Sequence, residues 1–224
     1  EFISNFSKAY DATKSKGYIA IPSSNHDYQR PNVAGRNTID QLKVAMTFFL
    51  TMPGVPFIYY GDEIAMKYQM DLPSKEGSND RAGTRTPMQW KNDAKAGFST
   101  CAPQNLYLPV DTKNGQLTVE AQENDKNSML NYVRELTALR HSSKAIGNDG
   151  DWQLLSNVSQ PYPMIYQRTH GNETYIIALN PSGKKVSAPL SVTSAQPVIV
   201  SGKALIGKNK INLNAFTAAI YRIK

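Results

Sequence analysis

The sequence has one cysteine, three histidines and no long hydrophobic run, and each shortage excludes a class of protein. With Cys101 alone, the chain forms no internal disulfide and no multi-cysteine metal site. His26, His141 and His170 lie far apart and match no zinc-ligand spacing, so we expect no metal site in this chain. No apolar stretch reaches about 18 residues, and we therefore predict no transmembrane segment.

The chain also lacks a basic run, although lysine and arginine outnumber the acidic residues by 25 to 18. Scattered positive charge without a basic amphipathic helix is typical of a solvated surface, so we expect no nucleic-acid partner. The length of 224 residues and the 40% hydrophobic content suffice for one large domain or two smaller ones. The first residues, "EFISNFSKAY", lack a methionine and open inside a helical pattern, which indicates a piece of a longer protein; any targeting signal would have been lost with the missing part.

Two short apolar runs flank a helical pattern in the first 60 residues. "YIAIP" ends at Pro22, "VPFIYY" covers 55–60, and "NTIDQLKVAMTFFLTM" between them predicts a helix capped by Asn37 or Thr38. Strand, helix and strand in this order are typical of a parallel sheet. Because both runs are apolar throughout, we expect both strands to be covered on both faces.

The rest of the chain changes character twice. Residues 61–125 are rich in Gly, Pro, Asn, Asp and Ser and show little periodicity, which in a compact domain indicates a segment that serves a site. A helix is predicted to open at Asn127 or Ser128. After it, seven short runs separated by turn residues predict antiparallel strands, so the fold class is α/β followed by an all-β sandwich.

Carboxylates follow both predicted parallel strands. Asp27 comes after the first strand, and Asp62 with Glu63 come after the second. Neighbouring parallel strands would bring these side chains together at one edge, as in retaining glycosidases, whose two carboxyl groups lie about 5 to 5.5 Å apart. Carboxylates at strand ends are also common as helix caps and loop anchors. From position alone, both interpretations stay open.

A series of motifs is more specific. "NHDYQRP", "MPGVPFIYYGDEIAM", "DRAGTRTPMQW", "AGFS", "VEAQ" and "SMLNYVRELTALR" follow one another in an order that strongly resembles the α-amylase superfamily of glycoside hydrolases, especially its α-glucosidases and oligo-1,6-glucosidases. The resemblance spans nearly the whole chain. It implies that residues 1–143 are the last part of a (β/α)8 TIM barrel, with strands seven and eight, and that residues 144–224 are an antiparallel β-sandwich domain.

The resemblance also implies roles for residues. Asp27 would be the third catalytic carboxylate, which stabilises the transition state, while His26 and Arg30 would bind the sugar. Arg30 has the alternative of pairing with a nearby carboxylate. Asp62 and Glu63 would support the residues that contact the substrate. Arg85, Gln89 and Trp90 would brace the long loop. The segments that hold the nucleophile and the general acid have no counterpart here, so we expect this chain alone to be inactive.

The function implied by the resemblance is the C-terminal part of a retaining hydrolase of α-glucosidic bonds in starch or similar oligosaccharides. The alternative is a non-catalytic glucan-binding or assembly module, with a sugar platform formed by Trp152, Tyr162, Tyr166, Tyr175 and Tyr221, side chains whose spacing also suits ordinary packing. We expect no cofactor in this segment, with calcium left open for the intact enzyme. An extracytoplasmic location is favoured over a cytoplasmic one. Uncovered strand edges predict self-association.

Overall fold

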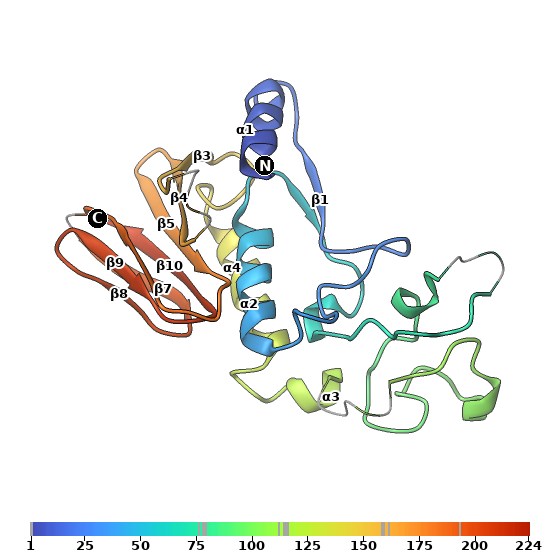
Figure 1. The fold of residues 1–224 in the computed structure, drawn as a ribbon. Helices are drawn as coiled ribbons and strands as arrows, with labels where there is room; N and C mark the ends of the chain where they lie inside the picture. The colour runs from blue at the N-terminus through green and yellow to red at the C-terminus, as the bar shows by residue number, and fades with distance from the viewer. Residues whose placement is uncertain are drawn as a thin grey trace. The chain divides into compact units, whose positions relative to one another are not determined.

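The structure is a computed structural model that describes residues 2–75, 77, 80–111, 113, 117–157, 160, 162–192 and 194–224. Its α-helices are α1 (Phe2–Thr13), α2 (Ile39–Thr51), α3 (Val119–Gln122) and α4 (Met129–Ser142), with short 3-10 helices at Asp62–Ile64, Ala82–Thr84 and Pro103–Asn105 (Figure 1). Its strands are β1 (Ala20–Pro22), β2 (Val55–Phe57), β3 (Asp151–Leu154), β4 (Met164–His170), β5 (Glu173–Asn180), β6 (Val186–Pro189), β7 (Ala195–Ser201), β8 (Ala204–Ile206), β9 (Lys210–Leu213) and β10 (Thr217–Ile223).

The chain divides into two compact units. The first comprises Glu1–Ile21, Lys43–Pro56 and Glu135–Lys224, and the second comprises Pro22–Leu42 and Phe57–Arg134. Four elements, β1, α2, β2 and α4, contain residues of both units. The domain boundary between residues 143 and 144 stays a prediction.

Strands β1 and β2 pair in parallel, as the sequence pattern predicted. The amide of Val55 donates to the carbonyl of Ile19 at 2.8 Å, and the amide of Ser23 donates to the carbonyl of Phe57 at 2.9 Å. Both chains therefore advance in the same direction along the ladder. The expectation that both strands are covered on both faces is wrong for this chain, because the sheet has only two strands among the described residues, and Ala20, Pro22 and Phe57 are exposed.

Helices α2 and α4 both begin at a residue whose side chain caps the helix. At α2, the hydroxyl of Thr38 accepts from the amide of Gln41 at 3.3 Å, and the Gln41 side chain accepts from the amide of Thr38 at 3.1 Å. This reciprocal pair is a capping box, and it confirms Thr38 as the cap. At α4, the hydroxyl of Ser128 accepts from the amide of Asn131 at 3.2 Å, which confirms Ser128.

The C-terminal strands form two antiparallel sheets. The larger has the order β3-β4-β5-β10-β7 and the smaller has the order β6-β9-β8 (Figure 1). One hydrophobic cluster contains residues of both sheets, among them Ile165, Ile176, Ala219, Ile211 and Leu213. All seven predicted strands are present, and β8 is an additional one.

Two arginines, the buried Arg168 and the partly exposed Arg140, bind carbonyls at the end of helix α2 and in the segment that follows α4. The guanidinium of Arg168, on β4, donates to backbone carbonyls, namely those of Thr51, Ile146, Gly147, Gly150 and Asp151. Arg140, on α4, donates likewise to the carbonyls of Leu50, Met52, Gly54 and Ile146 and to the Asn148 side chain. Burial lowers the pKa of Arg168 to about 10. These carbonyls include groups that a helix end leaves without a partner, so the arginines replace missing backbone hydrogen bonds.

We predict that Arg168→Lys destabilises the chain by about 3 kcal/mol, because a lysine has fewer donors in a less suitable geometry and leaves buried carbonyls unsatisfied. Urea unfolding measures the loss. The matched control is Arg222→Lys on β10, where the side chain is half exposed and meets Glu173 at 3.7 Å, a pair worth less than about 1 kcal/mol. Equal effects of the two substitutions would contradict the role assigned to Arg168.

Candidate functional site

The segment after β1 begins with a side-chain turn that positions Asp27. The side-chain oxygen of Asn25 accepts hydrogen bonds from the amides of Asp27, at 2.7 Å, and Tyr28, at 3.0 Å. Asparagine favours such turns because its short side chain reaches the backbone two residues ahead. The direction in which the Asp27 side chain leaves the backbone is therefore fixed locally.

The Asp27 carboxylate lies among two guanidinium groups and one imidazole. Its Oδ1 is 2.5 Å from Nη1 of Arg81 and 3.3 Å from Nη2 of Arg85. Its Oδ2 is 3.3 Å from Nε2 of His26. Arg85 also donates from Nε to the His26 carbonyl at 2.9 Å, so it holds both neighbouring residues of the motif. Two guanidinium groups thus converge on one carboxylate oxygen, while the other oxygen faces the imidazole.

This cluster is open to solvent. The Asp27 side chain is 40% exposed, and those of Arg81, Arg85 and His26 are similarly or more exposed. Ion pairs at such sites contribute at most about 1 kcal/mol each to stability. The cluster therefore contributes little to the stability of the fold. Buried contacts elsewhere must hold the backbone that carries these side chains.

That support is a buried ion pair between Arg30 and Asp62. Nη1 of Arg30 lies 2.9 Å from Oδ1 of Asp62, and both side chains are fully enclosed. Arg30 also donates to the carbonyls of Tyr60, at 2.6 Å, and Thr84, at 3.0 Å. The second oxygen of Asp62 accepts from the hydroxyls of Ser23 and Ser24 at 2.7 and 2.6 Å.

The ion pair joins three segments of the second unit: the loop 23–30, the segment 59–62 that follows β2, and the turn at 81–86. The rings of Tyr59 and Tyr60 lie over the guanidinium with centroids 4.9 and 4.8 Å away. Burial raises the pKa of Asp62, and the hydrogen bonds from Ser24, Ser23 and Arg30 act in the opposite direction. A single enclosed arginine thereby fixes the loop that carries Asp27.

The structure separates the predicted site residues into two groups. Asp27 and His26 lie together at the surface, whereas Arg30 takes the alternative position that the sequence left open, paired with a carboxylate. Its contact with a sugar stays a prediction. Asp62 is anchored through both oxygens, which leaves it unsuitable as a nucleophile, and its supporting role towards a substrate stays a prediction.

The aromatic platform expected for a sugar-binding module is not formed by the proposed side chains. Tyr166, Tyr175 and Tyr221 are buried. Trp152 packs edge-on against Phe6, with ring centroids 5.5 Å apart. Of this group only Tyr162 is substantially exposed. Ordinary packing therefore accounts for their spacing.

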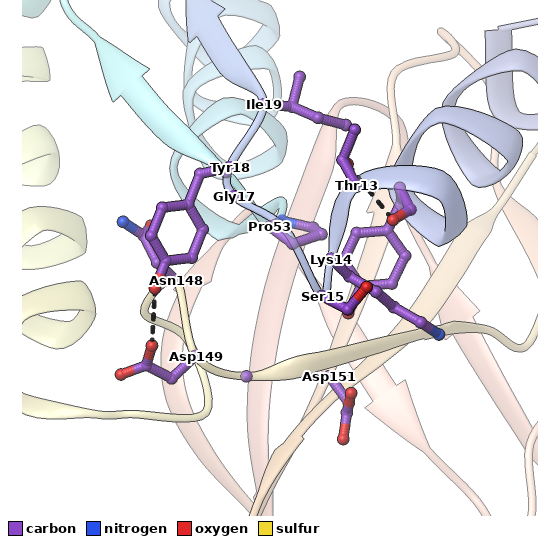
Figure 2. Close-up of a pocket in the computed structure, with 13 residues that line it drawn as sticks. Thr13, Lys14, Ser15, Gly17, Tyr18, Ile19, Pro53, Asn148, Asp149 and Asp151 are labelled. Atoms are coloured by element: carbon purple, nitrogen blue, oxygen red, sulfur yellow. Dashed lines mark hydrogen bonds between the residues drawn. The ribbon is translucent and has the colours of Figure 1, made fainter.

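A pocket of about 390 Å³ lies in the first unit. Figure 2 shows Tyr18 at its wall, with its hydroxyl donating to Oδ1 of Asp149 at 3.1 Å. Lys14, Pro53 and Asp151 also line it. None of the predicted site residues belongs to this pocket.

Two further properties concern the described residues only. They contain no helix long and apolar enough to cross a membrane. They also contain no cluster of three or more His, Cys, Asp and Glu side chains suited to a metal ion.

Comparison with known proteins gives a family assignment. The model of the alpha amylase catalytic domain matches residues 1–149, about two thirds of the chain. The chain belongs to the α-amylase family. Among curated proteins, it is 41% identical over 117 residues to trehalose synthase/amylase TreS of Mycobacterium tuberculosis, covering 50% of this chain and 18% of that protein. It is 28% identical to oligo-1,6-glucosidase of Parageobacillus thermoglucosidasius, covering 93% of this chain and 43% of that protein.

The fold of this α-amylase family chain agrees with solved structures. It superimposes on the α-glucosyl transfer enzyme XgtA with a TM-score of 0.85 at 20% identity, covering 100% of this chain and 43% of that one. The chain thus spans less than half the length of the relatives described here.

Sequence reasoning missed the partners of Asp27 in this α-amylase family chain. Arg81 was not singled out, and Arg85 was expected only as a brace, although both reach Asp27. They stand 54 and 58 residues further along the chain, in a segment without periodicity, so no local pattern pairs them with it. Gln89 does brace the long loop, since its side chain donates to the Leu117 carbonyl at 2.8 Å.

Glu63, next to Asp62 in the sequence, also has a raised pKa. Burial raises its pKa above the usual 4.5, against the opposing hydrogen bonds from the backbone of Glu63 and Gly61. One of its oxygens is enclosed and has no hydrogen-bond partner among the described residues. The folded state therefore holds the Glu63 proton more tightly than the unfolded state does.

We predict that the free energy of unfolding falls as the pH rises above 4.5, through the range in which Glu63 is protonated only in the folded state. Glu63→Gln removes this loss, so the stability of the variant relative to the native chain should rise between pH 4.5 and neutrality. Urea unfolding across this range tests it, with Glu135→Gln at an exposed position of α4 as the control. A constant difference between the native chain and Glu63→Gln would refute the assignment.

Proposed function

We propose that this chain is the C-terminal part of an enzyme that cleaves α-glucosidic bonds in starch or similar oligosaccharides by a retaining mechanism. Family membership supports the class of reaction. The observation that carries the proposal for this chain is the Asp27 carboxylate, fixed by the Asn25 turn and by two arginines while it stays open to solvent. An exposed carboxylate held in one place is suited to contact a ligand.

The two oxygens of Asp27 differ in what they can do. Oδ1 receives both Arg81 and Arg85, so it fixes the orientation of the group. Oδ2 lies 3.3 Å from Nε2 of His26, and it can accept from sugar hydroxyl groups. Hydrogen bonds that tighten as the sugar ring distorts towards an oxocarbenium-like state lower the barrier, because they are stronger in the transition state than in the ground state.

In this proposal, β1 and β2 are the seventh and eighth strands of a (β/α)8 barrel and residues 144–224 are its β-sandwich domain. Asp27 and His26 follow β1, where active-site residues of such barrels lie. The nucleophile and the general acid come from parts of the longer protein that this chain does not contain, so the chain alone is inactive.

The non-catalytic glucan-binding module loses its support, since three of its five aromatic side chains are buried. The other expectations continue as proposals: an extracytoplasmic location, self-association through the exposed strand region that includes Phe57, and calcium in the longer protein. For calcium, the described residues supply no cluster of three suitable ligands.

The test is Asp27→Asn in the longer protein. This substitution keeps the size of the side chain and removes its charge, and we predict a loss of several orders of magnitude in kcat on maltooligosaccharides, as for other groups that act in the transition state. Asp40→Asn, an exposed aspartate in the first turn of α2, is the matched control and should leave kcat nearly unchanged. A near-normal rate of Asp27→Asn would exclude the role, and hydrolysis by the 224-residue chain alone would contradict the division of catalytic groups.

A further inference from the structure

The net positive charge of the chain is concentrated in its last 51 residues. Residues 174–224 contain seven of the 25 lysines and arginines and none of the 18 aspartates and glutamates. They therefore carry a formal charge of +7, which is the net charge of the whole chain, while residues 1–173 contain 18 basic and 18 acidic residues. Protein surfaces usually mix both signs, so a segregation of this kind indicates a negatively charged partner.

The strand topology gathers five of these lysines, which are scattered along the sequence, around the smaller sheet β6-β9-β8 of the first unit (Figure 1). Lys184 and Lys185 precede β6, Lys203 precedes β8, Lys208 lies in the turn between β8 and β9, and Lys210 opens β9. All five side chains are exposed. None of them forms an ion pair within the part of the chain that the structure describes, so their charges are available to a partner.

Hydrogen bonds bring the lysines before β6 and β8 to one end of this sheet. The Asn180 side chain donates to the carbonyls of Lys184 and Asn214 at 2.7 Å each, and the amide of Asn214 donates to the carbonyl of Lys203 at 2.9 Å. The opposite end, where β9 begins at Lys210, is only about 10 Å away, because β9 is four residues long and a strand advances about 3.3 Å per residue. The lysines therefore surround one small face.

An exposed leucine lies within this face. Ile206, Ile211 and Leu213 point inward, because they pack in the hydrophobic cluster shared by the two sheets. Side chains alternate along a strand, so Leu205 and Lys210 point outward. Leu205 is 72% exposed. We call the five lysines together with Leu205 the basic face.

Lysines at sheet edges have a simpler explanation, since they discourage the pairing of edge strands between molecules. β6 and β8 are indeed the two edges of the smaller sheet. That explanation accounts for the lysines, but it requires neither the absence of every acidic residue from 174–224 nor an apolar side chain exposed among the charges. Both features favour a binding surface.

We propose that the basic face binds the surface of an anionic lipid bilayer. Each lysine close to such a surface strengthens binding by about fivefold, and an apolar side chain that enters the boundary between headgroups and acyl chains adds to it. A nucleic acid fits less well, because its recognition relies on arginine forks and stacked aromatic rings, and β6, β8 and β9 contain neither. This inference does not depend on the role of Asp27.

Sedimentation of the 224-residue chain with lipid vesicles measures the binding. Vesicles with about one third phosphatidylglycerol in phosphatidylcholine should bind it with half-saturation on the order of 0.1 mM accessible lipid in about 0.1 M salt. Raising the salt to about 0.5 M shortens the range of the charges and should weaken binding more than about tenfold. Pure phosphatidylcholine should not bind. Equal binding to both kinds of vesicle, or none to either at about 5 mM lipid, would overturn the proposal.

Matched pairs of substitutions separate the basic face from the net charge of the chain. Lys203→Gln combined with Lys210→Gln should weaken binding to the anionic vesicles by about 25-fold. Lys8→Gln combined with Lys126→Gln removes the same charge at exposed positions of other segments and should weaken it by less than about threefold. Equal losses in the two variants would show that binding follows net charge alone, and the basic face would be rejected.

Leu205→Ala identifies the kind of partner. Because the side chain is largely exposed, the substitution spares the core, and it should weaken binding to the vesicles by about tenfold through the apolar surface that no longer leaves water. Leu155→Ala, the same change after β3, should leave binding unchanged. Unaltered vesicle binding of Leu205→Ala would overturn the bilayer as the partner. Tighter binding of a DNA duplex than of the vesicles would assign the basic face to nucleic acid instead.

Discussion

The enclosed ion pair between Arg30 and Asp62 is the interaction on which the candidate site depends. Removing two charges from water costs several kcal/mol per ion, and the pair is stable only because further hydrogen bonds satisfy both groups. Here Ser23 and Ser24 donate to the carboxylate, and the carbonyls of Tyr60 and Thr84 accept from the two Nη atoms of the guanidinium, whose Nε has no hydrogen-bond partner among the described residues. Losing one partner would leave an uncompensated buried charge, so the three segments that meet at this pair are held together strongly.

The exposed cluster around Asp27 differs from the buried pair in that it adds little stability. The contacts of Asp27 with Arg81 and Arg85 are solvent-exposed and contribute little stability, at most about 1 kcal/mol each. Their value is geometric: they determine where one carboxylate oxygen points and leave the other accessible. A buried arginine fixes the backbone, and exposed arginines orient the group that meets the ligand. In the first unit, Arg168 and Arg140 also bind backbone carbonyls, at the end of α2 and in the segment after α4, and they take no part in the candidate site.

Much of the local structure could be predicted from the sequence, because it depends on short-range chemistry. The cap at Thr38 follows from a threonine three residues before a glutamine, and the cap at Ser128 from its place before an apolar helical run. β8 was missed because it is only three residues long and follows directly on the turn at Gly202. The burial of β1 and β2 was overestimated because apolar character shows what a strand can pack against, not what is present to cover it.

The site itself was only partly predictable for the same reason. Asp27 and His26 stand in one motif, and their neighbourhood is local. Arg81 and Arg85 reach Asp27 through an irregular loop, whose path no periodicity encodes. The environment of Arg30 depends on a carboxylate 32 residues away, and the sequence offered two positions for it without deciding between them.

A double-mutant cycle on Arg30 and Asp62 tests the central claim most directly. Arg30→Met, Asp62→Asn and the combined variant are unfolded in urea while Trp90 reports on the second unit. If the enclosed pair holds the site loop, each single substitution costs about 3 kcal/mol or more, and the combined variant costs at least about 2 kcal/mol less than their sum, because no unpaired charge is left. Additive effects of the two substitutions would show that the pair is not the support of the Asp27 loop.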